Sequence, residues 1–150
     1  MEKALFGAGC FWGIEEYFRK LEGVKKTSVG YSGGNLSKPS YKDVCTGKTG
    51  HAEVVLIEYD EVLLTYAELL NHFWRCHDPT QINEQGLDIG TQYRSVIFYY
   101  SDGQKKIAED SKENFQKNIG KPVATEISKA KEFFLAEDYH QCYIQKKNLV

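Results

Sequence analysis

The sequence predicts a mixed β-sheet with helices packed against it, in a single α/β or α+β catalytic domain that spans residues 1–150. Strand-like and helix-like segments alternate along the chain, although not in strict strand–helix–strand order. Residues 52–59 are apolar on both faces, which is typical of a central strand covered on both sides. A chain of 150 residues is long enough to bury a core of its own.

The N-terminal part is expected to form a strand, a helix and a second strand. Residues 4–6 are apolar and predict the first strand, and apolar side chains then recur at helical spacing over residues 11–21. Gly23 breaks the helical pattern, residues 24–31 predict the next strand, and residues 32–35 form a strong turn signal.

The middle of the chain continues this alternation. Residues 41–47 predict a short helical turn or loop, and residues 52–59 predict the central strand. Thr65 and Glu68 have the spacing of a capping box, which predicts a helix that runs to about Cys76.

The last third begins with a long loop at residues 81–92, and loops of this length in a compact domain are often functional. Residues 93–100 predict another strand, and a turn at 102–103 leads into a helix. A short strand is expected at residues 123–127, and a helix or helical turns at 132–145.

Composition narrows the class of protein. The net charge is -2 without a run of basic residues, so we expect no nucleic-acid or membrane partner. No apolar stretch is long enough to span a bilayer and no signal-peptide pattern opens the chain, which predicts a cytoplasmic protein with reduced thiols. Nothing in the sequence demands a dimer, so we expect a monomer. Neither the histidines nor the cysteines have metal-ligand spacing, so no metal and no cofactor is expected. The four cysteines are Cys10, Cys45, Cys76 and Cys142.

Cys10 is the candidate nucleophile. It lies in the motif GCFWG (residues 9–13), where the first predicted strand passes into the first predicted helix. A helix N-terminus favours an anion, so we expect the Cys10 thiol to lose its proton more easily than a free cysteine. Trp12 falls on the polar side of the helical wheel, which suggests one wall of an apolar ligand pocket. The alternative is ordinary packing of a buried cysteine and a partly buried tryptophan.

Glu53 is the candidate general acid. It stands near the start of the central strand between two apolar neighbours, where burial raises the pKa of a carboxyl and keeps it protonated near neutral pH. The alternative is a carboxylate that reaches water at the strand end. Tyr93 begins the next predicted strand, Tyr41 precedes Cys45, and Asp88 lies in the long loop. Each of these three also has an ordinary structural interpretation.

Five motifs together resemble the peptide methionine sulfoxide reductases of type A. They appear in order over nearly the whole chain: GCFWG (9–13), YxxVCTGxTGHAE (41–53), HDPT (77–80), DIGTQYRS (88–95) and AEDYHQ (136–141). The resemblance implies a two-layer sandwich with a ferredoxin-like core. It also implies reduction of the S-epimer of methionine sulfoxide, free or in proteins, and hence repair of oxidised proteins.

The resemblance assigns roles residue by residue. Cys10 would be the nucleophile, and Phe11 and Trp12 would form the pocket for the methyl group of the sulfoxide. Glu53, Tyr41 and Tyr93 would surround the sulfoxide oxygen, and Asp88 would bind the main-chain side of the substrate.

Regeneration of Cys10 would need a second thiol. A resolving cysteine would condense with the Cys10 sulfenic acid, and thioredoxin would reduce the disulfide. Many members of the family place this cysteine in a glycine-rich tail, which does not follow Cys142 here, so Cys142 is the candidate and Cys45 competes with it. Glutaredoxin or a small thiol acting directly is the alternative.

Two other classes remain open from the residues alone. A cysteine hydrolase would pair Cys10 with a histidine base such as His51 or His140. A redox-sensing or peptide-binding module would use the Trp12 pocket without turnover.

Overall fold

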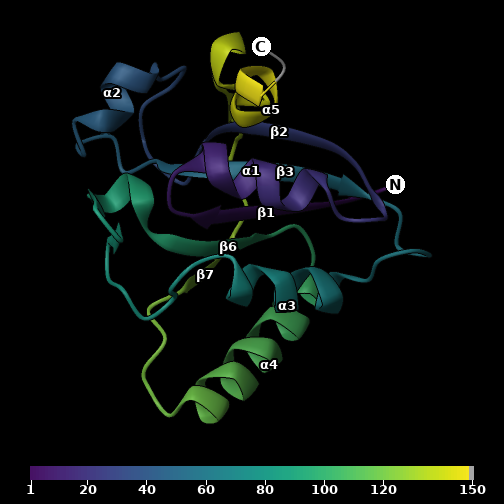
Figure 1. Cartoon of the computed structure of the whole chain (residues 1–150). Helices are drawn as coiled ribbons and strands as arrows, with labels where there is room; N and C mark the ends of the chain where they lie inside the picture. The colour runs from purple at the N-terminus through teal and green to yellow at the C-terminus, as the bar shows by residue number, and fades with distance from the viewer. Residues whose placement is uncertain (149–150) are drawn as a thin grey trace.

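The computed structural model describes residues 1–148 and contains one six-stranded sheet, in the strand order β7-β6-β1-β3-β2-β8, with helices packed against it (Figure 1). The elements in chain order are β1 (Glu2–Ala8), α1 (Phe11–Arg19), β2 (Val24–Ser32), α2 (Tyr41–Cys45), β3 (Ala52–Tyr59), α3 (Tyr66–Arg75), β4 (Glu84–Gln85), β5 (Asp88–Ile89), a 3₁₀ turn (Thr91–Tyr93), β6 (Ser95–Tyr99), α4 (Asp102–Ile119), β7 (Glu126–Lys129), β8 (Phe134–Leu135), a second 3₁₀ turn (Asp138–His140) and α5 (Tyr143–Asn148).

The centre of the sheet has ferredoxin-like topology. The unit β1-α1-β2-β3-α3-β6 forms antiparallel neighbours in the order β6-β1-β3-β2. Helix α4 then leads to β7, which pairs in parallel with β6, and β8 pairs with β2 at the opposite edge. The predicted mixed sheet and ferredoxin-like core are therefore confirmed.

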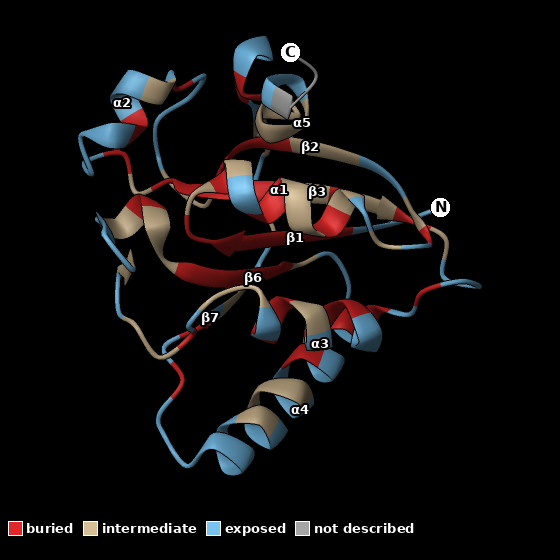
Figure 2. Cartoon of the chain, viewed as in Figure 1, coloured by how far each residue is buried: buried red, intermediate tan, exposed pale blue. Residues whose placement is uncertain are grey.

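Strand β3 is the central strand that its sequence predicts, since β1 and β2 flank it and its residues are largely buried. Val55 and Ile57 belong to the larger core with α1 and α3, which lie in front of the sheet in Figures 1 and 2. Val54 packs on the other face, where Phe133 from the coil between β7 and β8 contributes cover. The domain thus has two main layers, and a segment of irregular chain protects the second face.

Helix α3 begins as predicted. Thr65 accepts a hydrogen bond from the Glu68 N–H and the Glu68 side chain accepts from the Thr65 N–H, which completes the capping box. Leu69, Leu70 and Phe73 are buried against the sheet.

In the part of the chain that the structure describes, no helix combines the length and the apolar character that crossing a membrane requires.

Four predicted elements differ from the structure. The loop expected at residues 81–92 contains the short hairpin of β4 and β5, in which Glu84 lies opposite Ile89. Tyr93 does not begin a strand; it ends a 3₁₀ turn after Gly90, and β6 begins at Ser95. The strand expected at 123–127 begins only at Glu126, because Val123 and Ala124 donate their N–H groups to Gln116 and Pro79 rather than to β6.

The segment 132–145 is not one helix, because its first part pairs with the sheet. Leu135 lies opposite Gly30 of β2, and Phe134 lies opposite Tyr31. The chain then makes the second 3₁₀ turn before α5.

Antiparallel pairing brings the ends of β1 and β2 and the starts of β3 and β6 to the same end of the sheet. Ala8 at the end of β1 lies opposite Ser95 at the start of β6, and Tyr31 near the end of β2 lies opposite Glu53 near the start of β3. Residues far apart in the sequence therefore meet beside the start of α1.

Candidate active site

Cys10 occupies the N-cap position of α1 and is half-buried. Gly9 before it has a φ of 102°, in the region that favours glycine, and a Cβ there would lie 2.9 Å from Cγ of Gln85. The hairpin of β4 and β5 therefore approaches the chain closely just before the cysteine. The strand-to-helix position predicted for Cys10 is confirmed.

The surroundings of Cys10 do not give its thiol the expected acidity. Burial raises its pKa to about 11, the charges of Glu53 and Asp88 add to this, and the main-chain N–H groups of Trp12 and Gly13 only partly offset it. The helix N-terminus acts in the predicted direction, but desolvation outweighs it. The resting thiol is therefore protonated at neutral pH.

Glu53 is buried, as its apolar neighbours predict. Oε1 accepts a hydrogen bond from the Phe11 N–H at 3.1 Å, while Oε2 is buried without a partner among residues 1–148. Burial raises the pKa of this carboxyl to about 7, with a further contribution from Asp88 and an opposing one from the Phe11 N–H. The protonated fraction near neutral pH is what a general acid requires.

Tyr41, Tyr93 and Asp88 come from three elements, and all three interact electrostatically with Glu53. Tyr41 begins α2, Tyr93 ends the first 3₁₀ turn, and Asp88 is exposed on β5. Burial raises the pKa of Tyr93 to about 12, and the charges of Glu53, Asp88 and Cys10 act in the same direction. Burial, Cys45 and Glu53 also raise the pKa of Tyr41. Both phenols are therefore neutral donors near Glu53.

Phe11 and Trp12 form the apolar part of the site. Phe11 is buried and stacks on Tyr41, with ring centroids 6.4 Å apart. Trp12 is half-buried rather than simply on a polar face, because Tyr143 of α5 stacks on it at 3.9 Å with an interplanar angle of 10°. One face of the indole is thus covered by the protein itself.

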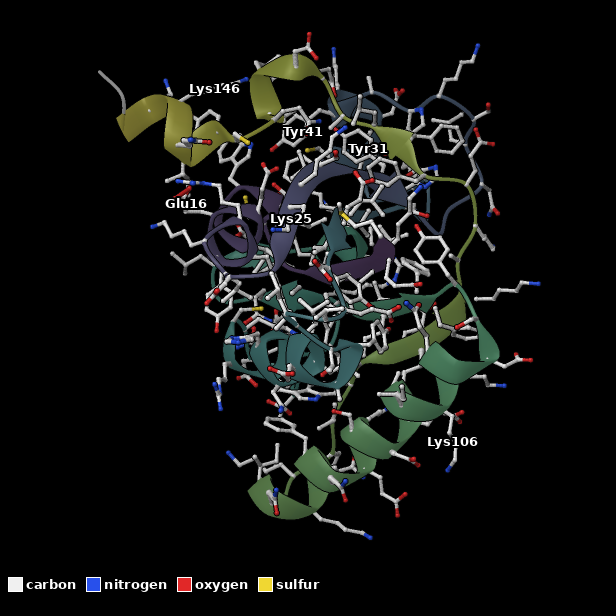
Figure 3. All side chains as sticks on the ribbon, turned by 90° about the vertical axis from the view of Figure 1, so that its right-hand side faces the viewer. Glu16, Lys25, Tyr31, Tyr41, Lys106 and Lys146 are labelled. Atoms are coloured by element: carbon white, nitrogen blue, oxygen red, sulfur yellow. The ribbon has the colours of Figure 1, made fainter. Side chains whose placement is uncertain are left out.

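Glu137 is a positioning residue that the sequence did not identify. Its Oε1 accepts from the Tyr31 hydroxyl at 2.9 Å, and its Oε2 accepts from the Tyr41 N–H at 3.1 Å. Figure 3 labels both tyrosines, which lie near the C-terminal segment. The AEDYHQ motif contains Glu137, but residues 132–145 were expected to form a helix or helical turns, and that expectation does not predict contacts of Glu137 with β2 and α2.

The other three cysteines have different surroundings. Cys142 has a φ of 50°, donates its N–H to Glu15 Oε1 at 2.6 Å and directs its thiol to Glu15 Oε2 at 3.8 Å. Cys45 is exposed, and its negative charge when ionised raises the pKa of both Tyr41 and Tyr93. Cys76 donates to the Phe73 carbonyl and packs against the core.

The two candidate bases for a cysteine hydrolase, His51 and His140, are engaged in other hydrogen bonds. His51 is buried and accepts from the Gly34 N–H through Nδ1, while Nε2 donates to the Leu36 carbonyl at 2.7 Å. His140 accepts from the Trp12 indole N–H. Both rings are held by other groups, so the hydrolase interpretation loses its base.

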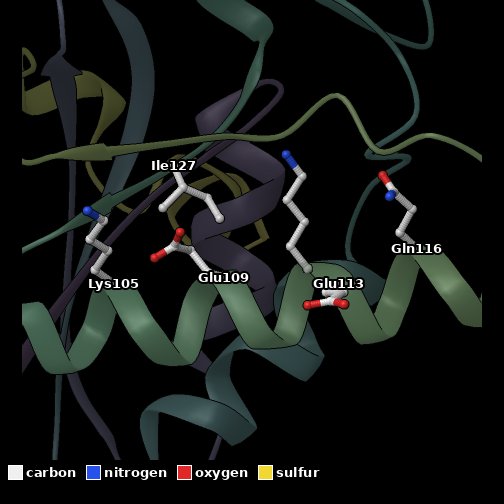
Figure 4. A pocket seen from close by; sticks show the side chains of 6 residues that line it. Lys105, Glu109, Glu113, Gln116 and Ile127 are labelled. Carbon is white, nitrogen blue, oxygen red and sulfur yellow. The ribbon is translucent and has the colours of Figure 1, made fainter.

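A pocket of about 440 Å³ lies between α4 and β7, away from the Cys10 site (Figure 4). Charged side chains such as Lys105, Glu109 and Glu113 line it together with Ile127. None of the residues that line this cavity is a predicted site residue, so it offers no alternative position for the chemistry of Cys10.

Comparison with known proteins gives a consistent result. A family model described as peptide methionine sulfoxide reductase matches residues 2–149. The peptide methionine sulfoxide reductase MsrA of Methanosarcina mazei is 54% identical over 152 residues, which cover 100% of this chain and 72% of that protein.

Solved structures agree with this match. The reduced form of Mxr1 from Saccharomyces cerevisiae aligns with a TM-score of 0.94 and 41% identity, over 99% of this chain and 87% of that chain. A structure of Mxr1 in complex with Trx2 aligns with a TM-score of 0.68 and 28% identity, over 95% and 84% of the respective chains.

Proposed function

Because the chain belongs to the peptide methionine sulfoxide reductase family, we propose that it reduces the S-epimer of methionine sulfoxide to methionine, both free and within proteins. The Glu53 carboxyl is the observation that carries this proposal. Its Oε2 is buried without a partner in the described chain, and its Oε1 is tied to the first turn of the helix that Cys10 begins. A protonated carboxyl there can supply the proton that a sulfoxide oxygen needs.

The residues divide the reaction between them. The Cys10 sulfur attacks the electrophilic sulfoxide sulfur, and the oxygen takes the proton of Glu53. The attack forms a bond between the two sulfurs, and the protonated oxygen then migrates to Cys10. This last step breaks the sulfur–sulfur bond and the S–O bond of the substrate as the S–O bond of Cys10 forms, which releases methionine and leaves a Cys10 sulfenic acid. The proton lost by the thiol restores the Glu53 carboxyl, so a resting thiol that is protonated at neutral pH fits this step. The substrate sulfur is reduced by two electrons as the Cys10 sulfur is oxidised by two, so this step needs no other oxidant or reductant.

The tyrosines and the aromatic residues support the same step. Neutral hydroxyls of Tyr41 and Tyr93 can donate to the oxygen as negative charge develops on it. Phe11 and the uncovered side of Trp12 offer an apolar wall for the methyl group of the substrate. We assign Asp88, which is exposed on the β4–β5 hairpin, to binding the main-chain side of the substrate.

A thiol must then return Cys10 to its reduced form. We assign thioredoxin as the reductant, supported by the Mxr1 structure in complex with Trx2, and glutaredoxin or a small thiol as the alternative. Cys142 remains the proposed resolving cysteine, with Cys45 as its competitor. In the structure, the Cys142 thiol points to Glu15, so it must leave that carboxylate to form a bond to Cys10.

Intact mass spectrometry tests the proposal in one turnover. The reduced protein is mixed with one equivalent of methionine S-sulfoxide in the absence of reductant, with the R-epimer as the matched control. A loss of two hydrogens, or a gain of one oxygen on Cys10, is expected with the S-epimer alone. An unchanged mass with all thiols free would overturn the proposed activity.

A further inference from the structure

The Trp12 indole is fixed by a residue from the far end of the chain. Its Nε1–H donates to Nδ1 of His140 at 2.8 Å, across 128 positions of sequence. Tyr143 stacks on the indole at the same time. One edge and one face of Trp12 are therefore held by the C-terminal segment.

His140 is itself held firmly. It is buried, and the rings of Phe11, Tyr41 and Tyr139 lie 5.2, 4.5 and 4.2 Å from its own. The side-chain amide of the neighbouring Gln141 accepts a hydrogen bond from the Val29 N–H and donates one to the Val29 carbonyl. These two bonds fix the backbone beside His140 to β2. The ring therefore has little freedom to follow the indole if the bond between them is lost.

The bond to Trp12 defines the protonation state of His140. Since Nδ1 accepts, the neutral ring carries its proton on Nε2, and that atom is buried without a partner among the described residues. A doubly protonated ring has no acceptor, so protonation would replace the hydrogen bond with two opposed N–H donors. Glu137 is the charged group that acts on His140 and favours its protonation, while burial outweighs it and lowers the pKa of the imidazole.

We propose that neutral His140 is a positioning residue that holds the Trp12 indole in place as a wall of the substrate pocket, and that protonation of His140 releases the indole. The link to catalysis rests on the proposed sulfoxide reduction. The hydrogen bond and its response to pH do not depend on it.

The hydrogen bond can be followed without any substrate by NMR of the indole N–H groups. The chain has two tryptophans, and the Trp74 indole N–H donates to the Ser111 hydroxyl at 2.8 Å, which does not titrate. As the pH falls below 6.5, the ordinary pKa of histidine, we expect the Trp12 resonance to shift and the Trp74 resonance to stay. No shift at Trp12 as the His140 ring titrates would overturn the proposal.

The variant His140→Asn separates the hydrogen bond from its titration. The Asn oxygen lies near the position of Nδ1 and still accepts, but it cannot be protonated. We expect the Trp12 resonance of this variant to be independent of pH, whereas His140→Leu should shift it at every pH. A pH-dependent Trp12 resonance that persists in His140→Asn would also overturn the proposal.

The kinetic readout is the KM for methionine S-sulfoxide. We expect His140→Leu to raise KM about tenfold at pH 7.5, with the Asn variant closer to the original protein, because a loose pocket wall weakens binding. The original protein should lose affinity at acid pH, and His140→Asn should not. His72→Asn is the matched control, since His72 bonds the Tyr17 hydroxyl at 2.9 Å, and it should alter neither KM nor the Trp12 resonance. An unaltered KM in His140→Leu would remove the link to binding, and absent turnover in every protein would reject only the proposed function.

Discussion

The main-chain N–H of Phe11 donates to Oε1 of Glu53 at 3.1 Å, and this bond joins the first turn of α1 to the start of β3. The N–H is one of those that a helix leaves unpaired at its N-terminus. Because the cysteine before Phe11 is the N-cap, the same bond places the carboxyl beside the Cys10 thiol. The backbone therefore positions the proposed acid and nucleophile relative to each other.

Replacing Glu53 with Gln should abolish most of the activity while preserving the bond to Phe11, because the amide oxygen can still accept. We expect kcat to fall about 10²- to 10⁴-fold, the range for loss of a general acid. In the original protein, kcat/KM should fall as the pH rises through about 7, where Glu53 loses its proton, and this limb should be absent in the variant. Glu58→Gln on the same strand is the control, and a Glu53→Gln protein with full activity would reject the assignment.

The same substitution should stabilise the protein at alkaline pH. The folded pKa of Glu53 is about 7 against an ordinary 4.5, so the folded state holds more protons than the unfolded state between these values. Stability therefore falls as the pH rises through this window, and the full cost above it is about 3 kcal/mol. Urea unfolding at pH 4 and pH 8 should show the Glu53→Gln variant gaining up to about that amount relative to the original protein. An equal difference at both pH values would show that Glu53 titrates normally.

Local patterns were sufficient to predict much of the fold. Strand β3 follows from apolar side chains on both of its faces, and the start of α3 follows from the spacing of Thr65 and Glu68. Both patterns are local in the sequence. The boundary errors at 123–127 and 132–145 arise where long-range pairing takes over, as when β8 pairs with β2. A periodicity argument contains no information about that partner.

The burial of Glu53 was predictable from the sequence, but the pKa of Cys10 was not. Glu53 was placed correctly because its immediate neighbours bury it. The pKa of Cys10 was misjudged because its desolvation depends on tertiary packing, which the local helix argument leaves out. The contacts of Glu137 with Tyr41 and of His140 with Trp12 span 96 and 128 positions, so one sequence could not reveal them.

Removing the hydroxyl of Tyr31 should lower the stability of the protein, whereas removing that of Tyr41 should lower its catalytic rate. The buried Tyr31 hydroxyl donates to Glu137, so Tyr31→Phe removes a bond to a charged group and should lower the free energy of unfolding by about 1–3 kcal/mol. Tyr41→Phe should instead lower kcat about 10- to 100-fold through loss of a donor to the sulfoxide oxygen. Denaturant unfolding and steady-state kinetics on both variants check this. The roles would be reversed if Tyr41→Phe lost stability and kept its kcat.

The resolving cysteine can be identified by comparing Cys142→Ser with Cys45→Ser. After one turnover with the S-sulfoxide and no reductant, Cys142→Ser should retain one added oxygen, whereas Cys45→Ser should lose two hydrogens and form the disulfide. The reverse pattern would identify Cys45, and a retained oxygen in the original protein would mean that no cysteine resolves the sulfenic acid.

Glu15 should control how fast that disulfide forms. Both the N–H and the thiol of Cys142 are directed to the Glu15 carboxylate, which also accepts from the Thr27 hydroxyl at 2.7 Å. Replacing Glu15 with Gln weakens these charge-assisted bonds. If Cys142 must leave Glu15 to reach Cys10, Glu15→Gln should form the disulfide several-fold faster in acid-quenched time courses followed by mass. An unchanged or slower rate, with sulfoxide reduction itself intact, would mean that release from Glu15 does not limit the step.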